Sequence, residues 1–119
     1  MRDLFDALHK PPVIVPVDRD GPVVQGEADV SFVLPHKRLA WHQAEIELHR
    51  HDNGLWMWSA SFNCGGHGSS YKVGAKWGKF AESKDDALFY AVQEIERRLE
   101  KSDGPEATAI LKWARGLVV

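Results

Sequence analysis

The sequence predicts an α+β fold in which a small antiparallel sheet packs against a C-terminal helix, with a second short C-terminal helix after it. Two segments with alternating apolar residues flank the turn sequence Asp52-Asn53-Gly54 and indicate a β-hairpin. Apolar residues at helical spacing after Ser83 indicate an amphipathic helix. The predicted sheet is a three-stranded meander, which strands from the N-terminal part of the chain would extend.

The composition indicates one small domain without an overall attraction to polyanions. The chain has 119 residues, 44% of them hydrophobic, and a formal net charge of −2. Nucleic-acid binding would therefore require a local basic patch. Cys64 is the single cysteine, and the N-terminus lacks the apolar core of a signal peptide. We expect a cytoplasmic protein that does not enter a membrane and uses no cofactor.

Residues 1–29 are expected to form an N-terminal arm, and residues 30–119 a single α+β domain. Residues 2–9 have the pattern of a short helix. Pro16 limits the β-branched run of residues 13–17 to an edge strand or an extended arm. At the start of the domain, the alternation of residues 30–34 indicates a half-buried strand.

The register of the hairpin follows from its apolar positions. Directly paired residues of an antiparallel ladder share a face. The apolar residues that define the pattern in residues 41–50 and 55–63 are even-numbered, and they are Ala44, Ile46, Leu48, Trp56, Trp58, Ala60 and Phe62. A two-residue Asn53-Gly54 turn would pair even with odd positions and split the core. A three-residue loop with Gly54 in the left-handed conformation avoids this. The resulting pairs are Ala44 with Phe62, Ile46 with Ala60, Leu48 with Trp58, and Arg50 with Trp56.

After the hairpin, residues 64–70 are expected to form a glycine-rich loop and residues 71–77 the third strand. The even-numbered face of the hairpin would pack against the helix. The odd-numbered side chains would then point to solvent. They are Gln43, Glu45, Glu47, His49, Met57, Ser59, Ser61 and Asn63.

The first helix is expected to begin after Ser83 as N-cap, with Asp86 three residues later as in a capping box. Its apolar stripe would comprise Leu88, Ala91, Val92, Ile95 and Leu99. Its solvent side would comprise Glu94, Glu96, Arg97, Arg98 and Glu100. Pro105 is predicted to open the second helix.

Two segments of the chain resemble the AP2/integrase N-terminal type of DNA-binding domain. They are Trp41-His42-Gln43-Ala44-Glu45-Ile46 and Trp77-Gly78-Lys79-Phe80-Ala81-Glu82-Ser83-Lys84-Asp85-Asp86-Ala87. The first forms a predicted strand, and the second forms the predicted junction between strand and helix. The resemblance implies that the exposed face of a three-stranded sheet, braced by one helix, binds DNA.

Six residues are candidates for a nucleic-acid site, and they are Lys37, Arg38, His67, Lys72, Lys76 and Lys79. Glu45 and Glu47, on the same predicted sheet face, oppose phosphate binding. The main hypothesis is a small non-enzymatic binding or accessory domain that binds nucleic acid through a local basic patch. The alternative is a protein-interaction module or homo-oligomeric adaptor that uses the mixed-charge sheet face or an edge strand.

Residues with metal-binding or nucleophilic chemistry are present, but their predicted positions do not form a site. His49 and His51 lie near the hairpin turn, whereas Cys64 and His67 follow the far end of the second strand, about 20 Å away. We therefore predict no metal site. A small enzyme based on Cys64 and His67 is the third hypothesis. No residue is assigned a catalytic role, because no third group orients this pair.

Overall fold

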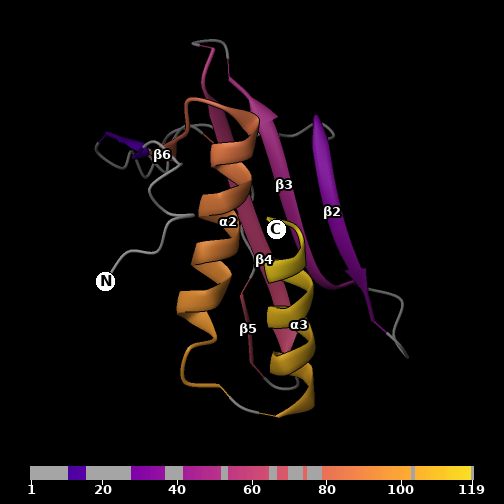
Figure 1. Cartoon of the computed structure of the whole chain (residues 1–119). Helices are drawn as coiled ribbons and strands as arrows, with labels where there is room; N and C mark the ends of the chain where they lie inside the picture. Colours follow the sequence, from indigo (N-terminus) through magenta and orange to yellow (C-terminus); the bar gives the residue numbers. More distant parts are fainter. Residues whose placement is uncertain are drawn as a thin grey trace.

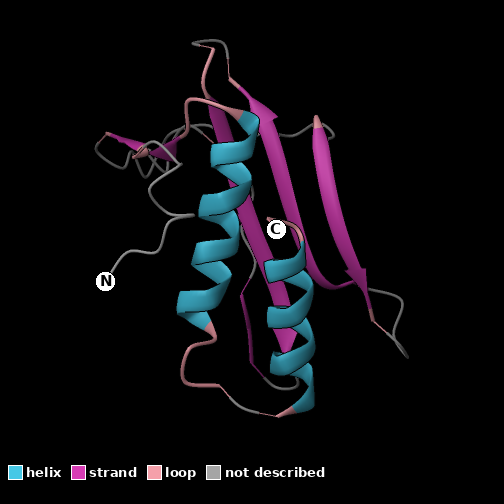
Figure 2. Ribbon diagram, viewed as in Figure 1, coloured by secondary structure: helices cyan, strands magenta, loops and turns pink. Residues whose placement is uncertain are grey.

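The protein, described by a computed structural model, has an α+β fold in which helices cover one face of an antiparallel sheet (Figure 2). The structure describes residues 11–15, 28–36, 42–51, 54–64, 67–69, 74, 79–102 and 104–118. The main sheet has the strand order β2-β3-β4-β5, with every pair antiparallel. Its strands are β2 (Val30–Pro35), β3 (His42–Arg50), β4 (Trp56–Cys64) and β5 (His67–Ser69).

A second, two-stranded sheet and two helices complete the described part of the chain. The small sheet pairs β1 (Val13–Ile14) with β6 (Lys79–Phe80). The helices are α2 (Lys84–Arg98) and α3 (Pro105–Gly116), and Pro105 opens α3 as predicted. None of the helices in the described residues is long and apolar enough to cross a membrane.

The predicted register of the β3–β4 hairpin is confirmed. The core pairs are Ala44 with Phe62, Ile46 with Ala60, and Leu48 with Trp58. Arg50 pairs with Trp56, and the His51 amide donates a hydrogen bond of 2.8 Å to the Leu55 carbonyl oxygen, so three residues form the loop. Gly54 has a φ of +85°, a left-handed value that glycine adopts without steric cost. The apolar residues of the three core pairs thereby share the even-numbered face, whereas Met57 lies on the other face.

Both helices cover this even-numbered face and lie side by side in front of the sheet (Figure 1). Helix α2 packs on β4 and β3, and α3 packs on β4 and α2. The fully buried side chains of the layer include Ile46, Leu48, Ile95, Leu99 and Ile110. Because each buried aliphatic side chain contributes about 1.5–3 kcal/mol, this layer is the main apolar source of stability in the described fold.

The main sheet matches the prediction at its β2 edge and differs from it at its β5 edge. The expected N-terminal extension is confirmed, because β2 pairs with β3 from Val30–Leu48 to Leu34–Ala44. The predicted loop over residues 64–70 is wrong in part, because His67–Ser69 forms β5 against β4. Two residues suffice to join antiparallel strands, so a pair of glycines is compatible with a hairpin as well as with a loop. The predicted third strand, residues 71–77, lies outside the described residues except for Gly74, as does the predicted helix of residues 2–9.

The β6 segment lies along the turn end of β4. Trp56 and Ala81 exchange two backbone hydrogen bonds of 2.8 Å each, on the edge of β4 that pairs with β5 further along. Phe80 packs against Met57 and Leu55 in a second, smaller apolar cluster. Both edges of β4 are therefore used, by β3 on one side and by β5 and Ala81 on the other.

Helix α2 begins as predicted but buries a wider surface than its apolar stripe. The Ser83 hydroxyl oxygen accepts a hydrogen bond of 3.1 Å from the Asp86 amide, which confirms the N-cap. The assignment of Glu94 to the solvent side is wrong, because Glu94 is only 5% exposed. Its Oε1 lies 3.6 Å from Nζ of Lys79 in β6, so an ion pair with a neighbouring segment accompanies its burial. Helical periodicity within α2 carries no information about that neighbour.

Candidate functional site

The odd-numbered face of the β3–β4 hairpin carries polar side chains, and the prediction that it points to solvent is wrong. Its buried residues are Gln43, His49, Met57 and Ser59, the last only 2% exposed. Its half-buried residues are Glu45, Glu47, Ser61 and Asn63. A sheet that reads DNA presents its polar side chains to solvent. The described face therefore differs from the open platform that the AP2-type resemblance implies.

At the turn end of the hairpin, the physical reason for this correction is the β6 segment. There Phe80 of β6 packs on Met57, and the centroids of the Phe80 and His51 rings lie 5.4 Å apart. The β6 segment is separated from Met57 by more than twenty residues in the sequence. The alternation within β3 and β4 defines two faces of the hairpin, but it does not indicate which distant segment covers each face.

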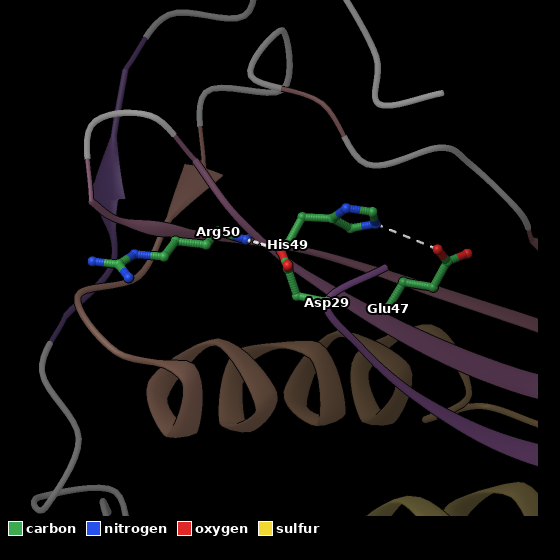
Figure 3. Close-up of polar contacts among 4 residues, drawn as sticks. All are labelled: Asp29, Glu47, His49 and Arg50. Carbon is green, nitrogen blue, oxygen red and sulfur yellow. Dashed lines mark hydrogen bonds and ion pairs between the residues drawn. The ribbon is translucent and has the colours of Figure 1, made fainter. Parts of the chain in front are cut away.

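Polar groups on the covered face find partners within it. His49 Nε2 lies 3.4 Å from Glu47 Oε2, and Figure 3 shows the two side chains facing each other along β3. The Gln43 side-chain amide donates a hydrogen bond to the backbone carbonyl oxygen of Asn63 on β4. Leaving a buried polar group unpaired costs about 1–3 kcal/mol, so these contacts reduce the cost of covering the face.

Glu45 also lies on this face, and its titration reflects partial burial. Loss of hydration raises the pKa of the Glu45 carboxyl group, because burial disfavours the charged form. The carboxylate of Glu47 raises this pKa further, whereas His42 lowers it. Two acidic groups thus occupy neighbouring positions on one side of β3, which disfavours an anionic ligand at this place.

The structure does not assemble the predicted nucleic-acid site among the described residues. Lys79 lies in β6 with 46% of its side chain exposed and pairs with Glu94. His67 lies in β5 opposite Cys64, at the other end of β4. Trp56 of β4 pairs with Ala81, and Cys64 of β4 pairs with His67. Trp56 and Cys64 are about 26 Å apart along the strand. The remaining candidates, Lys37, Arg38, Lys72 and Lys76, lie outside the described residues.

Cys64 occupies a position that does not favour a reactive thiolate. Burial raises the pKa of its thiol and the carboxylate of Glu106 raises it further, although a hydrogen bond from the Ala107 backbone lowers it. His49 and His51 lie at the turn end of the hairpin and Cys64 at its far end, as expected. Within the described part of the chain, no group of three or more His, Cys, Asp and Glu residues is placed to hold a metal ion.

The outer edge of β2 is the longer of the two edges that the described main sheet leaves unpaired, the other being that of β5. In the described sheet β2 has a neighbour on one side only, which is β3. The Arg50 amide donates a hydrogen bond of 2.8 Å to Asp29 Oδ2 beside β2, as Figure 3 shows. Amides of an antiparallel strand alternate in direction, so the even residues of β3 direct theirs toward β2. It follows that Ser31 and Val33 of β2 direct their amides and carbonyls away from β3.

The side chains of β2 leave apolar surface at the same edge. Val30, Phe32 and Leu34 lie on the helix-facing side and contact the core, yet all three are only half-buried. The helices pack mainly over β3 and β4, and β2 lies beyond them in Figure 1. Natural edge strands are usually protected by charged residues, by proline or by a bulge. In β2 these devices are confined to its end, where Pro35 follows a shift in register, and residues 30–34 carry no charge.

The sequence predicted β2 as a strand but did not assign it a site. The sequence signal for a binding edge is the absence of charge over residues 30–34. A half-buried strand in the interior of a sheet would lack charge as well, so this signal does not identify an edge. Comparisons with protein-family models, curated proteins and solved structures found no match to this chain. The resemblance to the AP2/integrase N-terminal type of domain therefore stays a prediction.

Proposed function

We propose that this chain is a small binding domain that takes up an extended protein segment as an additional strand along β2. The observation that carries this proposal is the uncharged outer edge of β2, where Ser31 and Val33 direct their backbone groups away from β3. In strand addition, main-chain hydrogen bonds supply affinity and alternate side chains supply specificity. β2 offers both the outward-facing backbone groups and the alternating side chains that this mode of binding uses.

The energetic argument has two parts. Each new backbone hydrogen bond contributes about 0.5–1.5 kcal/mol, and two outward-facing residues can make about four such bonds. An added strand would also cover the exposed parts of Val30, Phe32 and Leu34, with a gain of about 25 cal/mol for each Å² of apolar surface removed from water. A partner with apolar residues at alternate positions would use both contributions.

The experiment selects peptides from a displayed library of random sequences on the full chain. The selected peptides are then titrated against the wild type, Val33→Pro and Val33→Ile. Val33→Pro removes an outward-facing amide without removing a β2–β3 hydrogen bond, and proline is tolerated on edge strands. Val33→Ile keeps the amide and the β-branched shape, so it is the matched control. Thermal unfolding of each variant verifies that the fold is retained.

We expect Val33→Pro to weaken peptide binding about tenfold or more, and Val33→Ile to change it less than about threefold. Equal binding to Val33→Pro, or a failure to select any peptide on a chain that stays monomeric, would overturn the proposal. A generic DNA duplex serves as a second probe. Salt-dependent duplex binding that Val33→Pro leaves unchanged, without peptide binding, would favour the nucleic-acid hypothesis instead.

A further inference from the structure

We infer that the strand taken up by β2 is the β2 strand of a second copy of this chain, paired antiparallel about a two-fold axis. This inference rests on the proposed function, because it names the partner of the same edge. The resulting dimer would join two four-stranded sheets into one continuous sheet. A self-complementary edge requires matching hydrogen-bond positions, matching side chains and no repulsion between charges, and β2 meets each requirement.

The hydrogen-bond requirement defines the register. Residues with outward-facing backbone groups must lie opposite each other, so Ser31 and Val33 must pair with Ser31 or Val33 of the second copy. Pairing Ser31 with the second copy's Val33 places each of residues 30–34 opposite a residue of the same segment in the second copy. The two-fold axis then passes between the two Phe32 residues. If Ser31 paired with Ser31, the Asp29 carboxylate would lie opposite Val33. If Val33 paired with Val33, Pro35, which has no backbone N–H, would lie opposite Ser31.

The side chains fit this register. Phe32 faces Phe32 in a pair without mutual hydrogen bonds, where side chains of neighbouring strands come closest. On the same helix-facing side, Val30 lies opposite Leu34 of the second copy. These three side chains are half-buried in the single chain and would be covered by their counterparts. Aromatic pairs of this kind stabilise sheets beyond their apolar area.

Charges do not oppose the association. Residues 30–34 are uncharged, so no like charges lie directly opposite each other. Glu45 and Glu47 are on β3, with Val33 and Ser31 between them and the new edge. In the dimer, Glu45 of one copy and Glu47 of the other are separated by three strand spacings, about 14 Å. Repulsion at this distance is largely screened at physiological ionic strength.

The experiment is a charge exchange at the two-fold axis, measured by sedimentation equilibrium from low micromolar to near-millimolar concentration. The wild type is expected to form dimers. Phe32→Glu and Phe32→Lys should each dimerise at least tenfold more weakly, because each places like charges opposite each other. An equimolar mixture of the two variants should recover association as a heterodimer. A merely unstable variant would not be rescued by mixing.

A second pair of variants tests the register if the Phe32 variants do not fold. In a Cys64→Ser background, Ser31→Cys mixed with Val33→Cys should form a disulfide between the two chains under mild oxidation. Ser31→Cys alone should crosslink at least tenfold more slowly, because the two copies of residue 31 are not opposite each other in this register. Equal crosslinking of the single variant would overturn the inference.

The outcomes separate this inference from the proposed function. A chain that stays monomeric at every concentration, yet binds selected peptides in a manner sensitive to Val33→Pro, would overturn the dimer and keep strand addition. If the chain dimerised but neither the charge exchange nor Val33→Pro changed its dimerisation, the inference that β2 forms the interface would be overturned. The exposed residues Val13, Ile14 and Val15 of the β1 segment would then be the alternative interface. Dimers that respond as expected support both.

Discussion

The two faces of the β3–β4 hairpin are formed by alternate residues of the same two strands, yet they are buried in different ways. The even-numbered face is apolar, and both helices pack on it. The odd-numbered face is largely polar, and Phe80 of β6 covers its turn end. Apolar burial stabilises the first face directly, whereas polar burial on the second requires internal partners such as Glu47 for His49. The comparison shows that burial alone does not identify the source of stability.

The strongest test of this contrast is Ile46→Ala on the even-numbered face. Ile46 is fully buried, and we expect the substitution to lower the free energy of unfolding by about 2–5 kcal/mol, because it leaves a cavity. Ile46→Val should cost only about 0.5–1.5 kcal/mol. Ser61→Ala, on the other face, should change stability by less than about 0.5 kcal/mol. Urea unfolding measures all three, and a Ser61 effect as large as that of Ile46→Ala would contradict the contrast.

The cover of the odd-numbered face is tested by Phe80→Ala. We expect a loss of about 3 kcal/mol in local stability, because Phe80 is buried against Met57 and Leu55. The backbone amides of Trp56 and Ala81 hold β6 to β4, so their hydrogen exchange should become faster. Phe80→Leu, which keeps an apolar side chain of similar size, is the control.

The two faces should respond differently to this change. The amide of Ile46, beneath the helices, should remain as protected in Phe80→Ala as in the wild type. If protection were lost equally at Ile46 and Trp56, the two faces would open as one unit, and the distinction between them would be wrong.

The smallest expected effect concerns the acidic part of the polar face. Burial and Glu47 raise the pKa of Glu45, so the folded state binds its proton more tightly than the unfolded state. Stability should therefore fall as the pH rises through the raised pKa. Glu45→Gln removes this loss, and we expect it to be more stable than the wild type by about 0.5 kcal/mol at pH 7.

The pH dependence provides the control for this prediction. The difference between Glu45→Gln and the wild type should vanish as the pH falls below about 4, where the carboxyl group is protonated in both states. Ser61→Ala, which lies opposite Glu45 without changing a charge, should retain the wild-type pH dependence. Urea unfolding at several pH values measures this, and a constant difference at all pH values would exclude titration as its cause.

Local patterns in the sequence were sufficient for several elements of the fold. The hairpin register was predictable because a one-residue shift would have moved Leu48 or Trp58 off the apolar face. The N-cap at Ser83 was predictable because capping involves residues three positions apart. Strand β5 was missed because the glycines before it suit both a loop and a hairpin. The basic residues proposed for nucleic-acid binding had no local pattern that fixes their spatial grouping.

The sequence by itself determined the α+β class, the register of the central hairpin and the strand character of residues 30–34. Only the tertiary structure decided that Phe80 covers Met57, that Lys79 meets Glu94, and that β2 lies at the edge of the sheet. The physical reason is that periodicity and capping are properties of neighbouring residues, whereas cover and edge position depend on contacts between distant segments. The proposed binding edge belongs to the second kind, because an uncharged strand becomes a binding surface only when its place in the sheet leaves one side unpaired.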